Sequence, residues 1–131
     1  MATDVRFEDK NNQKKEISVF ASGVLSTSAT MDLTLFTLPK ASLVKSAYVY
    51  VETASGTSTD TVDIKVGSTV VANEVVVGTT GTKTGSVTAA YFATGGTVSV
   101  VAGADAPDAG GRFKVVIEYI ETELCEGTYT D

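Results

Sequence analysis

Apolar and polar residues alternate through segment 112–121, the last long apolar stretch of the chain. Its large apolar side chains fall on one side of an extended backbone: Phe113, Val115, Ile117 and Tyr119. The other side carries Arg112, Lys114 and Glu118, together with Val116 and Ile120. Because successive side chains of a strand point to opposite faces, the pattern predicts a strand with one fully apolar face. We expect this strand near the middle of a sheet.

Similar short apolar segments recur along the chain. We expect strands at 17–21, 31–35, 43–53, 61–66, 69–77, 87–92 and 97–101. Pro39 ends the second of them because proline donates no ladder hydrogen bond. Gly67 and Ser68 predict a tight hairpin turn. In the third strand the alternation places one set inward, Leu43, Ala47, Val49 and Val51, and the other set outward, Tyr48, Tyr50 and Glu52.

Segments rich in serine, threonine and glycine separate these strands and predict loops at 23–30, 54–60, 78–85 and 102–111. Roughly eight strands at short spacing, with no helical period, predict an all-β fold. The simplest arrangement is an antiparallel β-sandwich of jelly-roll type. Residues 1–16 are polar apart from Phe7 and predict an N-terminal arm, and residues 17–131 predict a single β-sandwich domain.

The chain of 131 residues carries a net charge of −6. An acidic protein repels nucleic acid and anionic membrane, so we expect neither as a partner. The basic cluster Lys10, Lys14 and Lys15 is interpreted as part of a solvated arm. The first residues lack a signal-peptide pattern, and no stretch approaches the ~20 apolar residues of a membrane helix. These features predict a soluble protein made in the cytosol.

Catalytic chemistry is disfavoured because the chain contains no histidine, the usual general base near neutral pH. Segment 78–85 has glycines and a lysine but lacks the spacing of a phosphate-binding loop. Glu118, Glu121 and Glu123 are interpreted as a solvated face, although a carboxylate-based enzyme stays formally open. We therefore expect a protein that is not an enzyme and binds no cofactor.

Metal binding has little support in the sequence. One cysteine and no histidine cannot supply the four ligands of a zinc site. Calcium remains open, since Asp105 with Asp108, or Asp60 with Asp63, could offer oxygen ligands, but neither pair matches a known calcium loop. Cys125 is interpreted as a passive thiol, because the neighbouring glutamates raise a thiol pKa.

Four segments in this order resemble small virion proteins of tailed bacteriophages: 37–41, 44–53, 62–67 and 110–119. The first is a leucine-proline entry into a long core strand. The last resembles a closing strand of the pattern Gly-aromatic-x-Val-x-x-x-Tyr, with Arg112 inserted between Gly111 and Phe113. The resemblance covers residues 31–121 and implies a compact β-sandwich without catalytic activity.

The resemblance further implies a capsid decoration (cement) protein that binds the outer surface of the major capsid shell and stabilises it. Its partners would be the major capsid protein and further copies of itself in a homotrimer, located on the outer surface of the virion. The candidate interface residues are Arg6, Phe7, Lys14, Lys15, Tyr48, Tyr50 and Tyr129. Tyrosines suit both cross-strand packing and interfaces. The alternative is a tail or head-fibre module that binds a host glycan through Tyr91, Phe92 and Tyr129.

Overall fold

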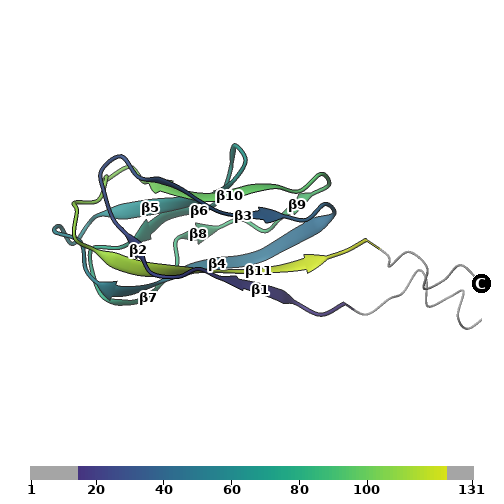
Figure 1. The fold of residues 1–131 in the computed structure, drawn as a ribbon, viewed down its shortest axis with the longest axis horizontal. Helices are drawn as coiled ribbons and strands as arrows, with labels where there is room; N and C mark the ends of the chain where they lie inside the picture. The colour runs from purple at the N-terminus through teal and green to yellow at the C-terminus, as the bar shows by residue number, and fades with distance from the viewer. Residues whose placement is uncertain (1–14, 124–131) are drawn as a thin grey trace, which may run out of the picture.

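A computed structural model describes residues 15–123, which form two antiparallel sheets packed face to face (Figure 1). The strands are β1 (Ser18–Ala21), β2 (Leu25–Ser26), β3 (Asp32–Leu38), β4 (Ser42–Thr53), β5 (Thr61–Val66), β6 (Thr69–Val76), β7 (Gly81–Lys83), β8 (Ser86–Val87), β9 (Ala90–Phe92), β10 (Gly96–Ala102) and β11 (Arg112–Glu121). The first sheet has the order β1-β11-β4-β7, with β2 also paired to β11 and β9 to β4. The second sheet has the order β3-β10-β5-β6-β8. The predicted all-β sandwich is therefore confirmed.

The strand pairs are nested around a single hairpin. β5 and β6 pair directly across the turn at Gly67, whose φ of 58° lies in the left-handed region that glycine adopts at no steric cost. Outside this hairpin β4 pairs with β7, β3 with β10 and β1 with β11. A long antiparallel ribbon rolled into two sheets produces such nesting, so the order is compatible with a jelly roll. The jelly-roll type stays a prediction.

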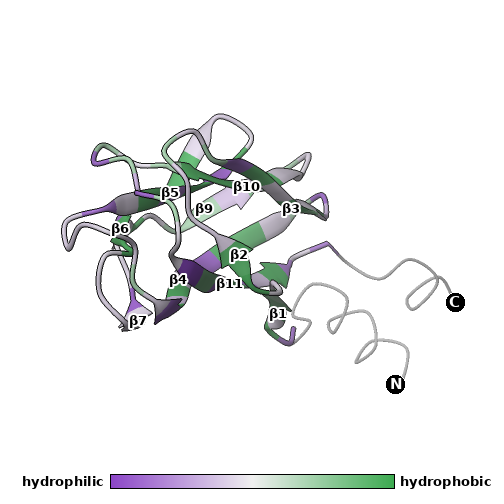
Figure 2. Ribbon diagram, turned by 60° about the vertical axis from the view of Figure 1, so that its left-hand side comes forward, coloured by the Kyte–Doolittle hydropathy of each residue, from purple (hydrophilic) through white to green (hydrophobic). Residues whose placement is uncertain are grey.

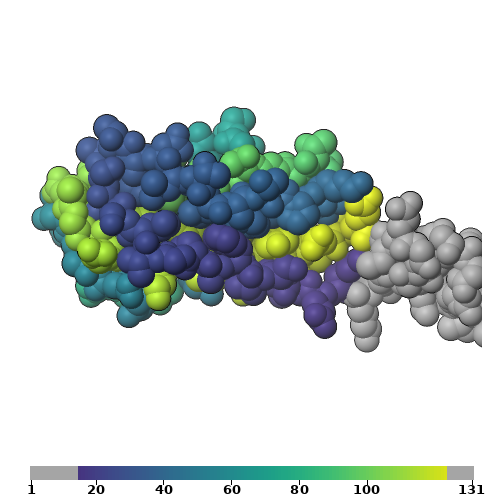
Figure 3. Space-filling model, in the orientation of Figure 1, coloured from purple at the N-terminus to yellow at the C-terminus, as the bar shows by residue number. Residues whose placement is uncertain are grey.

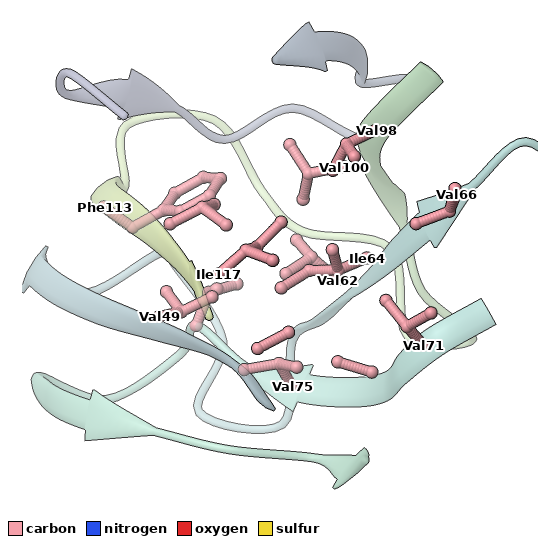
Figure 4. Close-up of a cluster of buried hydrophobic side chains, with 14 of the residues drawn as sticks. Val49, Val62, Ile64, Val66, Val71, Val75, Val98, Val100, Phe113 and Ile117 are labelled. Atoms are coloured by element: carbon pink, nitrogen blue, oxygen red, sulfur yellow. The ribbon is translucent and has the colours of Figure 1, made fainter. Parts of the chain in front are cut away.

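The core lies between the inner faces of the two sheets (Figure 4). From β11 of the first sheet, Phe113, Val115 and Ile117 are fully buried, as the alternation predicts. From the second sheet, strand β5 contributes Val62, Ile64 and Val66, and β10 contributes Val98 and Val100. Burying a side chain of this size stabilises a fold by about 1.5–3 kcal/mol before entropy is counted. The predicted central position of the last strand is confirmed, since β11 lies between β1 and β4.

A β-bulge in β4 changes which residues point inward. The pairing with β11 runs from Ser46 opposite Glu118 to Val44 opposite Tyr119, so Lys45 is an extra residue without a partner. As a result Val44 is fully buried, whereas Leu43 is half-buried and lies opposite Ile120. The prediction that Leu43 points into the core is therefore wrong. Strict alternation fails here because the bulge inserts one residue into the period of two.

Three predicted loops or strands also need correction. The segment 78–85 is not only a loop, because it contains β7, which pairs with β4. The loop 23–30 likewise contains β2. The expected strand 87–92 is two short strands in different sheets, β8 paired to β6 and β9 paired to β4. The described residues thus hold eleven strands instead of roughly eight.

Aromatic side chains close one lateral opening of the sandwich. Phe20 of β1 stacks on Phe36 of β3, with ring centroids 4.1 Å apart and an interplanar angle of 13°. Phe36 also contacts Tyr119 of β11 at 5.9 Å. Offset or tilted pairs at such distances add about 0.5–1.5 kcal/mol beyond the area that they bury. The two sheets are therefore joined by packing where β1 and β3 lie at their edges.

The division into an arm of residues 1–16 and a domain of residues 17–131 stays a prediction, because residues 1–14 and 124–131 lie outside the described residues. Within residues 15–123 there is no helix of the length and apolar character that a membrane crossing requires.

Candidate interaction face

The outward side of the first sheet carries a row of large apolar side chains at one end. Leu43 of β4 lies opposite Tyr91 of β9 on one side and opposite Ile120 of β11 on the other. Directly opposed residues in antiparallel strands point to the same face of the sheet, so these three side chains are neighbours. Tyr91 is 54% exposed. The row therefore presents an aromatic and two aliphatic side chains to the outside.

A second row crosses the middle of the same side. Tyr48 of β4 lies opposite Val116 of β11, and Val116 lies opposite Ala21 of β1. One step further along β4, Tyr50 lies opposite Lys114 and is 47% exposed. The aliphatic stem of a lysine covers apolar surface while its charge stays in water. We call the outward side chains of β1, β4, β9 and β11 the first-sheet face.

Two pairs of polar side chains on this face are engaged with each other. The Ser46 hydroxyl donates a hydrogen bond to Glu118 Oε1, which lies opposite it on β11. Lys114 Nζ lies 3.9 Å from Glu52 Oε1. On the far side of Glu118, Val19 of β1 is 59% exposed. Paired polar groups between exposed apolar ones make this face easier to desolvate than a surface of isolated charges.

The outward side of the second sheet has a different composition. Ser99 of β10 lies between Thr34 of β3 and Lys65 of β5. The next outward row joins Asp32, Val101 and Asp63. Most of these positions are polar or charged, which is typical of a surface that stays in water. In Figure 2 hydrophobic (green) and hydrophilic (purple or pale) segments succeed each other along strands of both sheets.

Tyr48 and Tyr50 are the predicted interface residues that the structure brings together, two positions apart on the first-sheet face. Lys15 lies away from them, just before β1, where its Nζ donates to the backbone oxygen of Glu123 at 2.8 Å. Four predicted interface residues lie outside the described residues: Arg6, Phe7, Lys14 and Tyr129.

Sequence reasoning missed several members of this face, namely Val19, Leu43, Val116 and Ile120. The available signal was the presence of Val116 and Ile120 on the otherwise charged side of the last strand. The hypothesis that Tyr91, Phe92 and Tyr129 bind a glycan together is corrected in one respect. Tyr91 points outward, but Phe92 pairs with the buried Ser42 and packs against the core, so the two aromatic side chains do not share a surface.

A buried carboxylate ties together the loops at the end of the sandwich where β4 leads into β5. Asp60 Oδ2 accepts hydrogen bonds from the Ser55 hydroxyl at 2.7 Å, from Asp108 N at 3.1 Å and from Thr57 N at 3.2 Å. The Ser55 hydrogen bond lowers the pKa of Asp60 below its ordinary value of 3.8, burial opposes this, and the two backbone donors reinforce it. Asp60 is 4% exposed, so its charge is stabilised by donors instead of by water.

Three of the four aspartates considered for calcium, Asp60, Asp63 and Asp108, accept hydrogen bonds elsewhere. Asp63 Oδ1 accepts the Glu74 backbone N–H at 2.7 Å, and Asp108 Oδ2 accepts the Thr57 hydroxyl at 2.7 Å. Asp60 faces the loop donors described above. Among residues 15–123 no group of three or more histidine, cysteine, aspartate or glutamate side chains is arranged to hold a metal ion.

Comparison with known proteins gives a likeness of fold. A chain of the cyanophage Pam1 capsid asymmetric unit matches with a TM-score of 0.55 and 18% sequence identity, covering 82% of this chain and 86% of its own length. A chain of the disulfide-linked pili that form Bacillus endospore appendages covers 85% of this chain and 94% of its own, with 21% identity and a TM-score of 0.39. No family model and no curated protein matches the sequence. The cyanophage chain is thus similar to this protein in its β-sandwich fold.

Proposed function

We propose that this protein is a structural component of a bacteriophage virion, namely a decoration protein that binds the outer surface of the major capsid shell and stabilises it. The observation that carries the proposal is the fold shared with a chain of the cyanophage Pam1 capsid asymmetric unit. The aligned region covers most of both chains, so the similarity concerns the whole sandwich instead of one motif.

The two outward surfaces of the sandwich support this role. A decoration protein needs one surface that packs on the shell and another that stays in water. The first-sheet face combines Tyr48, Tyr50 and Tyr91 with aliphatic neighbours, and tyrosine is enriched at protein interfaces. The second sheet exposes threonine, serine, aspartate and lysine. We therefore assign the shell contact to the first-sheet face.

The proposed mechanism is binding without catalysis. Many copies on one shell would add their individually modest contacts, because each anchored copy bridges neighbouring capsid subunits. The resemblance of the sequence also implies a homotrimer, and this oligomeric state is part of the proposal. The partner is then the major capsid protein, and the location is the outer surface of the particle.

Decoration of empty shells tests the proposal. Purified protein added to undecorated shells of the encoding phage should sediment with them and raise their melting temperature. Tyr50→Lys should abolish both effects, since it places a charge in the contact, whereas Ser99→Lys on the second sheet should leave them unchanged. Absence of co-sedimentation and of any melting shift with the wild-type protein would refute the decoration role.

The alternative function is a tail or head-fibre module that binds a host surface glycan. It is favoured only by Tyr91, which is 54% exposed beside Leu43, because exposed aromatic rings are suitable stacking surfaces. A glycan array probed with the wild-type protein and with Tyr91→Ala tests this function. Hits that disappear in the variant would support it, and an array without hits would exclude it.

A further inference from the structure

Strand β1 is an edge strand without the usual protection of edges. Within residues 15–123 it pairs only with β11, so its other side is a free backbone edge. The strand Ser18–Ala21 contains no charge and no proline. Natural sheets protect free edges with charges, bulges or very short strands, because an unprotected edge recruits another strand. Figure 3 shows β1 along the lower rim of the described body.

The other sheet edges among residues 15–123 do carry such protection. β3 begins with Asp32 and contains a bulge where its pairing with β10 shifts between Val98 and Ser99. The remaining edge strands are shorter than β1, since β7 and β9 have three residues each and β2 and β8 have two. Among residues 15–123, β1 is therefore the longest edge strand without a charge or a bulge, and its Val19 is 59% exposed.

The hydrogen bonds after β1 identify which backbone groups face the free edge. Ser22 N donates to Val115 O at 2.9 Å, and Val115 N donates to the Ser22 hydroxyl at 2.8 Å. Backbone groups of alternate residues in a strand point to the same neighbour. Phe20 and Ser18 therefore direct their N–H and C=O groups toward β11. Ile17, Val19 and Ala21 direct theirs away from it, toward the free edge.

We propose that β1 pairs in antiparallel orientation with β1 of a second copy of this chain, around a two-fold axis at Val19. In this register Val19 lies opposite Val19 of the second copy, and Ile17 lies opposite Ala21. These are the residues whose backbone groups face the free edge, so each pair exchanges both of its hydrogen bonds. Their side chains form an outward row that is entirely apolar and self-complementary, as an isologous contact requires.

The uncharged, self-complementary apolar edge favours a second copy as the occupant, and the placement of polar residues favours this register over its neighbour. Two chains of net charge −6 repel each other, and an uncharged edge lets them approach with little local repulsion. Centring the axis on Phe20 would place Glu16 opposite Val24 and Ile17 opposite Gly23, outside the strand. Centring it on Val19 places Glu16 opposite the polar Ser22 and Ile17 opposite Ala21 of β1.

The pairing joins two first-sheet faces into one continuous surface, with Val19 at its centre. The contact does not depend on the proposed decoration role, because it follows from the strand edge alone. If the chain also forms a homotrimer through another surface, the β1 contact would join two such trimers. The expected species in solution is therefore a dimer or, with trimers, a hexamer.

Charge complementation at position 19 tests the pairing. The full chain is examined by sedimentation equilibrium as the wild type, as Val19→Lys, as Val19→Glu and as an equal mixture of the two variants. Like charges directly opposite each other destabilise a strand pair, so each variant alone should weaken association about tenfold or more. The equal mixture should regain the association, because opposite charges then face each other across the strand pair. Val70→Lys, an exposed position of the second sheet, is the control and should associate like the wild type.

Circular dichroism melting separates this effect from misfolding. Both Val19 variants should melt as β-proteins, because Val19 is already 59% exposed. A wild type that is monomeric or trimeric would overturn the proposal. So would unchanged association of Val19→Lys, or a mixture of the two variants that associates no better than each alone.

Discussion

The outward surfaces of the two sheets differ although their inward surfaces are alike. Both sheets contribute valine, isoleucine and leucine to one core. Outward, the first sheet presents Tyr48, Tyr50, Leu43 and Ile120, whereas the second presents mainly serine, threonine and charged residues. The need to bury a core explains why the inward sides of both sheets are apolar. A side that only faces water is expected to be mainly polar, and this holds for the second sheet but not for the first.

This difference shows that stability and binding are divided between the sides of the same strands. On β11, Phe113 points inward and is fully buried, while its neighbour Lys114 points outward and pairs loosely with Glu52. A substitution at an inward position should therefore change the free energy of unfolding. A substitution at an outward position of the first sheet should change association instead.

The largest expected effect comes from the core. Phe113→Ala removes a fully buried ring and should lower the free energy of unfolding by about 3–5 kcal/mol. Lys114→Ala, the adjacent outward residue, should change it by less than about 0.5 kcal/mol. Urea denaturation followed by circular dichroism measures both. Equal losses in the two variants would contradict the assignment of inward and outward faces on β11.

The next effect concerns shell affinity, which should depend on the first-sheet face alone. Tyr50→Ala and Tyr91→Ala should each weaken binding to undecorated shells about tenfold or more, because truncated interface tyrosines leave unfilled contacts. Val70→Ala, on the outward side of the second sheet, should bind like the wild type. Titration of labelled protein onto shells gives the dissociation constants. A loss with Val70→Ala comparable to that of the tyrosines would remove the distinction between the faces.

The inward pattern could largely be predicted from sequence because it is local. The alternation in segments 61–66 and 112–121 correctly identifies the buried side, and Gly67 correctly marks the hairpin turn. The bulge at Lys45 could not be predicted, since it depends on pairing between β4 and β11, which are distant in sequence. Strand β7 and the division of segment 87–92 into β8 and β9 could not be predicted for the same reason, since β7 and β9 pair with β4 and β8 pairs with β6.

The first-sheet face could be predicted only in part. Tyr48 and Tyr50 are recognisable because they are neighbours on one strand. The row of Tyr91, Leu43 and Ile120 joins three strands, and its formation depends on register that no local pattern contains. The bulge also moves Leu43 from the predicted inward side to this row. Residues that act together across strands become visible only when the pairing is known.

A smaller effect is expected at the buried carboxylate, which supports the loops and belongs to neither outward face. Asp60→Asn should lower the free energy of unfolding by about 1 kcal/mol at pH 7, because hydrogen bonds to a charged acceptor are stronger than those to a neutral one. The folded-state pKa of Asp60 is depressed. The stabilisation is therefore complete above pH 3.8, the ordinary pKa, and is lost as the pH falls below it through the folded-state value.

Unfolding free energies measured between pH 7 and pH 2.5 test this dependence. The difference between the wild type and Asp60→Asn should shrink as the carboxylate becomes protonated. Asp105→Asn, in a neighbouring loop on an exposed residue, serves as the control. A difference that stays constant over the whole range would show that the charge of Asp60 does not stabilise the loops.

The smallest effect should come from the ion pair on the first-sheet face. Lys114 Nζ and Glu52 Oε1 are 3.9 Å apart, and their side chains are 45% and 35% exposed. Exposed pairs of this kind contribute little, so Glu52→Gln should change the free energy of unfolding by less than about 0.5 kcal/mol. Its effect on shell binding should be visible in the salt dependence of the association rate, because charges near an interface act mainly on encounter. Stopped-flow binding at low and high salt measures this, and a variant that binds shells with unchanged salt dependence would place the pair outside the contact.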